Sequence, residues 1–143
     1  MFLNPFTNKQ ITASRIHSDL LRIFQLKPNN LHIDIFIDDQ ILFQVMAAKN
    51  FSSHGFQHQD PDDYTEIHFF NKNKTKTIDA QYNIKNTDLA KAYYYYEEPK
   101  GNHNFLRAIG KDPDKIAHTI MDRFKVIYGL KELSSIRIDY NDY

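Results

Sequence analysis

The residues most capable of chemistry lie in a polar loop. Two imidazoles, His54 and His58, precede three carboxylates, Asp60, Asp62 and Asp63. Imidazole and carboxylate side chains bind zinc, manganese or non-haem iron when a fold brings them together. The alternative interpretation is a solvated loop whose polar side chains satisfy its own backbone.

Two features of this loop weaken the metal hypothesis. A spacing of four would align His54 and His58 on a helix, but Gly55 and the polar neighbours disfavour a helix there. The segment also lacks the His-Glu-x-x-His pattern, so it carries no built-in general base. We therefore predict no catalytic residue, no metal and no cofactor. A metal-assisted hydrolase remains the alternative function, and its residues would be His54, His58, Asp60 and Asp62.

A run of four tyrosines followed by two acids is the second candidate site. Its members are Tyr93, Tyr94, Tyr95, Tyr96, Glu97 and Glu98. On a helix, four consecutive side chains point in nearly every direction, so Tyr93 and Tyr96 could pack inward while Tyr94 or Tyr95 is exposed. An exposed tyrosine combines an apolar body with a polar tip, which is typical of protein interfaces. We predict a partner-binding surface; the alternative is an extended segment in which all four tyrosines pack on a sheet.

Composition narrows the classes of function. The formal net charge is zero and the chain has no cysteine. Disulfides, thiol nucleophiles and zinc–thiolate sites are therefore excluded. Lys72, Lys74 and Lys76 could touch phosphate, but alternate lysines at a turn more often keep a sheet edge soluble. Because duplex-binding domains usually carry a basic excess, we expect no nucleic acid partner.

The start of the sequence, MFLNPFTNKQ, lacks a basic segment followed by a long apolar run. That pattern marks secretory signals, so none is expected. No apolar stretch approaches the length that spans a bilayer. We therefore expect a cytoplasmic protein with no membrane partner.

Hydrophobic periodicity predicts the elements that must position these candidates. Helices are predicted over residues 7–26, 87–96 and 112–129, and strands over 31–37, 41–48, 64–70, 75–84, 105–109 and 135–140. For residues 93–96, both helix and strand remain open. The 112–129 helix is the best specified, because Asp112 can cap its first turn and Gly129 suits its end. We predict a single α+β domain over residues 1–143, with an antiparallel sheet of four to six strands and the N-terminal and C-terminal helices packed on it.

The segment IAHTIMDRFKVIYGL, Ile116 to Leu130, resembles the closing helix of small α+β chaperones of type III secretion. The order of one helix, several antiparallel strands and another helix is similar to that group as well. The resemblance implies a monomer or homodimer that holds a partner against its sheet without catalysis. It assigns no individual residue a role.

These observations predict a small, non-catalytic bacterial protein that binds another protein. One version is an immunity protein that neutralises a cognate toxin, and the other is a chaperone or adaptor for a secreted effector. An immunity protein should occlude the active site of a folded toxin domain. A chaperone should bind an extended segment, often by strand addition at a sheet edge.

Overall fold

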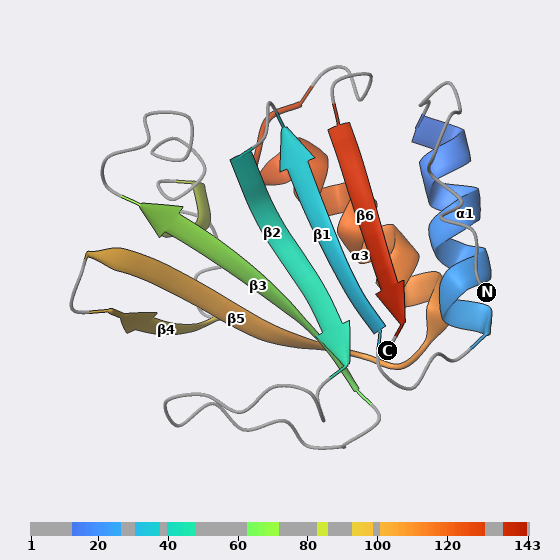
Figure 1. Cartoon of the computed structure of the whole chain (residues 1–143), viewed down its shortest axis with the longest axis horizontal. Helices are drawn as coiled ribbons and strands as arrows, with labels where there is room; N and C mark the ends of the chain where they lie inside the picture. The colour runs from blue at the N-terminus through green and yellow to red at the C-terminus, as the bar shows by residue number, and fades with distance from the viewer. Residues whose placement is uncertain are drawn as a thin grey trace.

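The computed structural model describes residues 13–26, 31–37, 40–47, 63–71, 83–85, 93–98, 101–130 and 136–142. In chain order, the elements are α1 (Ala13–Gln25), β1 (Leu31–Ile37), β2 (Gln40–Ala47), β3 (Tyr64–Asn71), β4 (Tyr94–Glu97), β5 (Asn102–Gly110), α3 (Pro113–Val126) and β6 (Ile136–Asp142). The strands form one sheet in the order β4-β5-β3-β2-β1-β6 (Figure 1). Every neighbouring pair is antiparallel. The predicted α+β architecture is confirmed.

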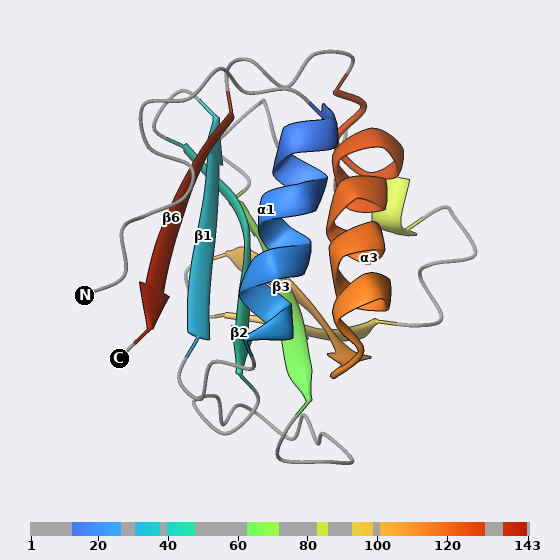
Figure 2. The same cartoon turned by 90° about the vertical axis from the view of Figure 1, so that its right-hand side faces the viewer.

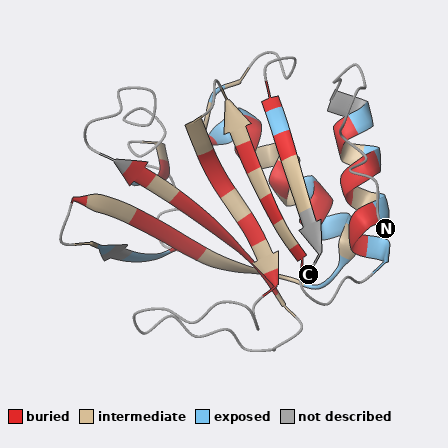
Figure 3. Ribbon diagram, in the orientation of Figure 1, coloured by how far each residue is buried: buried red, intermediate tan, exposed pale blue. Residues whose placement is uncertain are grey.

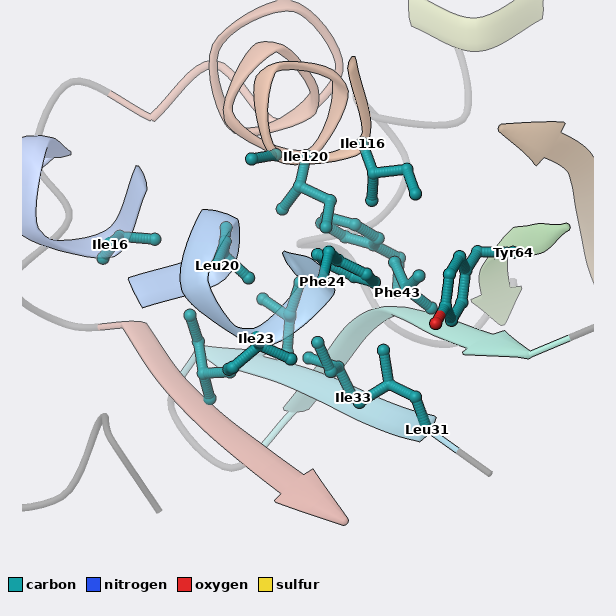
Figure 4. Packing of buried hydrophobic residues seen from close by; sticks show 14 of the residues in the cluster. Ile16, Leu20, Ile23, Phe24, Leu31, Ile33, Phe43, Tyr64, Ile116 and Ile120 are labelled. Carbon is teal, nitrogen blue, oxygen red and sulfur yellow. The ribbon is translucent and has the colours of Figure 1, made fainter. Parts of the chain in front are cut away.

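Helices α1 and α3 lie side by side on one face of the sheet (Figure 2). The strands place alternate apolar residues on that face, because successive side chains of a strand point to opposite sides. Ile33, Ile35, Phe43 and Val45 supply the sheet side of the core and are fully buried. The two helices supply Ile16, Leu20, Ile23, Phe24, Ile116, Ile120 and Phe124 (Figure 4). Buried positions therefore concentrate in the central strands and the inner helix faces (Figure 3).

Helix α3 begins directly after the predicted cap, Asp112, and its last residue, Val126, comes shortly before the predicted end at Gly129. The Asp112 carboxylate accepts a hydrogen bond from the Asp114 N–H at 3.0 Å, which satisfies one of the first unpaired donors of the helix. After the helix, Gly129 adopts φ 61°, a left-handed conformation that glycine reaches without strain. The chain reverses there, and the Leu130 N–H donates back to the Phe124 carbonyl at 3.0 Å.

Most of the predicted strands are confirmed. The structure has strands at 31–37, 40–47, 64–71, 102–110 and 136–142, within a few residues of the predicted ranges. β6 forms one edge of the sheet. The described part of the predicted first helix is α1, and the remainder of the predicted range, residues 7–12, lies outside the described residues.

The strand predicted over 75–84 is wrong at its end. Residues 83–85 are helical, and residues 75–82 lie outside the described part of the chain. Ile84 is buried beside Phe70, Phe105 and Ile127, and the Asn83 side-chain amide donates to the Ile127 carbonyl at 2.8 Å. Packing against the end of α3 therefore determines the structure here, which a sequence alternation cannot reveal.

The helix predicted over 87–96 is also wrong where the structure describes it. Tyr94–Glu97 forms strand β4, which pairs with β5. Tyrosine favours strands, since its ring packs well on a pleated surface next to cross-strand neighbours. The strand alternative for these residues is thus the correct one.

Candidate functional site

The tyrosine run lies at one edge of the sheet that the described strands form. β4 is the terminal strand, and within the described residues it pairs only with β5. Tyr93 is 8% exposed, whereas Tyr94 and Tyr95 are 36% and 41% exposed. The predicted burial of Tyr93 and exposure of Tyr94 or Tyr95 are confirmed, although the backbone is extended; the side chain of Tyr96, which was predicted to pack inward, lies outside the described part of the structure. We call Tyr94, Tyr95 and Glu97, together with the outer backbone of β4, the β4 surface.

Contacts on several sides hold Tyr95 in one position. Its ring stacks on His103 with the ring centroids 5.9 Å apart, and its hydroxyl is hydrogen-bonded to the His103 Nδ1. The Phe105 ring lies 5.0 Å away and the Lys85 Nζ lies 5.5 Å from the Tyr95 centroid. Partial burial, and next the negative charge of Glu97, raise the Tyr95 pKa. The hydroxyl therefore stays protonated at neutral pH, and a partner would meet an ordered aromatic group.

A buried polar network lies beneath α3, beside this edge. Glu66 and His68 are 1% and 0% exposed, and Arg123 is 4% exposed. The Glu66 Oε1 accepts hydrogen bonds from the Arg123 Nε and the His68 Nε2, each at 2.9 Å, and from the Tyr93 hydroxyl. Burial alone would raise the Glu66 pKa, but His68 and Arg123 together lower it from 4.5 to about 2. Glu66 is therefore ionised and fully hydrogen-bonded.

His68 links the network to the end of α3. Its Nδ1 lies 2.6 Å from the Tyr128 hydroxyl, which in turn lies 2.9 Å from the Leu42 carbonyl. Leu42 is the extra residue of a bulge in β2, so its carbonyl is available outside the regular ladder. Burial, together with the positive charge of Arg123, lowers the His68 pKa although Glu66 acts in the opposite direction. A ring with its proton on Nε2 donates to Glu66, and the Tyr128 hydroxyl, which has one proton to give, lies between the His68 Nδ1 and the Leu42 carbonyl.

These residue types are common in active sites, but here the acid and the imidazole are closed to a substrate. Every polar atom of Glu66 and His68 is engaged by another side chain, and neither residue reaches the surface. The network therefore works as a polar cross-link between the sheet and α3. Sequence reasoning missed Glu66 and Arg123. The available signal was the spacing of Glu66 and His68, two residues apart in a central strand. Side chains at this spacing lie on the same face of the sheet, and Ile67 between them points to the other face.

An open groove runs beside α3. It has a volume of about 820 Å³ and lies where α3 meets the end of β5 and His17 of α1. Arg107, Lys115, His118 and Arg123 contribute to its lining. We call it the α3 groove. Arg123 joins it to the buried network, because the same guanidinium binds Glu66.

The predicted metal-site residues cannot be placed. His54, His58, Asp60 and Asp62 lie outside the described residues, as do the three lysines of the predicted turn, Lys72, Lys74 and Lys76. Within the described ranges, no three His, Asp or Glu side chains are grouped so that they could hold a metal ion. Glu98 is described, and its carboxylate accepts hydrogen bonds from the Asn102 and Asn104 side chains. It thus supports the β4–β5 connection.

Comparison with known proteins gives no match: no family model, curated protein or solved structure is similar to this chain. Among the described helices, none has the length and apolar character needed to cross a membrane.

Proposed function

We propose that this chain is a non-catalytic, cytoplasmic bacterial module that binds another protein through the β4 surface. The partner would be a toxin that the chain neutralises as an immunity protein, or a secreted effector that it serves as a chaperone or adaptor. The observation that carries the proposal is the position of exposed Tyr94 and Tyr95 on an edge strand.

The backbone of an edge strand supports the proposal. β4 donates to and accepts from β5 along one side, and its other side has no strand beside it among the described elements. Such an edge is a template for an added strand. A short edge strand also limits unwanted pairing, so a partner would need side-chain contacts in addition to backbone hydrogen bonds.

The side chains offer those contacts. Tyrosine is enriched among the residues that dominate binding energy, and Tyr95 is already ordered by His103 and Phe105. Ordering in the free protein lowers the entropy lost on binding. The Glu97 side chain is 53% exposed on the same face of the strand as Tyr95, so a partner with an apolar strand and a nearby basic side chain would complement the surface.

The test is a comparison of affinities for a partner that co-purifies from the source organism. The variant Tyr94→Ser/Tyr95→Ser removes both rings, and Leu26→Ser is the control, because Leu26 is a 55% exposed apolar residue at the end of α1. We expect the double variant to weaken binding by about tenfold or more and the control to leave the affinity unchanged. Circular dichroism must show that both variants are folded. Equal affinities for the double variant and the wild type would refute the proposal.

The same partner distinguishes the two versions. A peptide from a disordered segment that binds as tightly as the whole partner would indicate a chaperone. Binding that requires the folded toxin domain, together with loss of toxin activity, would indicate an immunity protein. A chain that self-associates through the same edge would form a homodimer, and light scattering would detect it.

A further inference from the structure

We infer that the α3 groove is a binding site for a small oxyanion, a phosphate or carboxylate group, with Arg107 as its principal anchor. This site is separate from the β4 surface and does not depend on the proposed function.

The first argument is the state of Arg107. Arg107 lies directly opposite Glu66 in the β3–β5 ladder, on the side of the sheet that faces the helices. Opposite charges at such positions usually pair. Here the Glu66 carboxylate is instead occupied by Arg123, His68 and Tyr93. Among the described residues, no acidic side chain lies within ion-pair distance of Arg107.

The second argument is the balance of charge in the groove. Lys115, like Arg107, has no ion-pair partner among the described residues. Of the two acids in the lining, Asp122 is engaged by the Arg123 guanidinium at 3.2 Å, which leaves Asp114. An anion would therefore meet two available cations against one available carboxylate.

The third argument is geometric. Arg107 is half-buried and lines the groove, and a guanidinium presents a planar fork of donors that matches the oxygens of carboxylate or phosphate. His17 and His118 line the same groove and offer further ring N–H donors. A volume of about 820 Å³ falls in the range of small-molecule sites. The groove can thus hold a small molecule that carries the anionic group.

The test is a titration of the full chain with sodium phosphate and, separately, with sodium succinate, in which the amide chemical shifts are monitored by NMR. The ionic strength is held constant, and a titration with sodium chloride gives the reference shifts. We expect saturable shifts in residues 107–109 and 114–119 with at least one of the two anions. Saturation with phosphate alone identifies a phosphorylated ligand, and saturation with succinate alone identifies a carboxylate. Shifts no larger than those with chloride, or shifts outside the groove, would overturn the inference.

Variants locate the anchor. Arg107→Gln should weaken the binding by about tenfold or more, since a charge-assisted hydrogen bond is lost. Arg137→Gln is the control, because Arg137 is an exposed arginine on β6, stacked on Phe36 at 4.3 Å; it should bind as the wild type does. If Arg107→Gln does not fold, the exposed Lys115→Gln repeats the test with a smaller expected loss. Binding that is unchanged in the folded variant would overturn the assignment.

Discussion

Removal of the Glu66 charge should destabilise the protein strongly. In Glu66→Gln the shape of the side chain is kept, but Arg123 loses the carboxylate that its Nε contacts at 2.9 and 3.2 Å. Breaking a buried ion pair on one side costs about 3–5 kcal/mol, because the remaining charge loses its buried partner. The lowering of the Glu66 pKa from 4.5 to about 2, which arises from the same contacts, corresponds to the same order of magnitude, about 3 kcal/mol.

Urea unfolding at pH 7, followed by circular dichroism, measures this loss. We expect the free energy of unfolding of Glu66→Gln to fall by about 3 kcal/mol, with a decrease in Tm of about 10 °C. The matched control is Asp122→Asn, which removes the other carboxylate on Arg123. The Asp122 side chain is 41% exposed, so its loss should cost less than about 1 kcal/mol.

A double-mutant cycle separates the ion pair from general damage. The loss in Glu66→Gln combined with Arg123→Met should be smaller than the sum of the two single losses, because no buried charge remains unpaired. If Glu66→Gln costs no more than Asp122→Asn, the network does not stabilise the fold as described here.

Two further predictions concern the same end of the molecule. The buried His68 has a pKa below 6.5, so the unfolded chain binds more protons, and the free energy of unfolding should fall as the pH drops below about 6.5. In urea titrations between about pH 6.5 and 5, His68→Gln should make the free energy of unfolding less dependent on pH. An unchanged dependence in this variant would contradict the prediction. Gly129→Ala should destabilise by about 1 kcal/mol, because φ 61° is strained for alanine although nothing lies within 4 Å of the added carbon; a higher Tm would contradict this.

The elements with a strong hydrophobic period could be predicted from the sequence. β1 follows from Leu31, Ile33 and Ile35 on one face, and α3 follows from its cap at Asp112 and its end at Gly129. Both signals are local, because the alternation or spacing reflects burial against one partner layer. Local signals do not give the strand order, and they fail where packing against a distant element decides, as at Ile84.

The candidate site was predictable only in part. The exposure of Tyr94 and Tyr95 follows from the length of the tyrosine run, but their position on an edge strand depends on pairing with β5. The Glu66–Arg123 ion pair joins residues 57 positions apart, and nothing in either local segment indicates the other. The α3 groove likewise exists only once β5 and α3 meet.

The most direct measurement is amide hydrogen exchange of the free protein and of its complex with the co-purified partner. If the partner binds at the β4 edge, the amides of Tyr94–Glu97 should exchange more slowly in the complex, because their outer hydrogen bonds or their access to water change on binding. Protection confined to other elements, with exchange of Tyr94–Glu97 unchanged, would contradict the proposed binding surface.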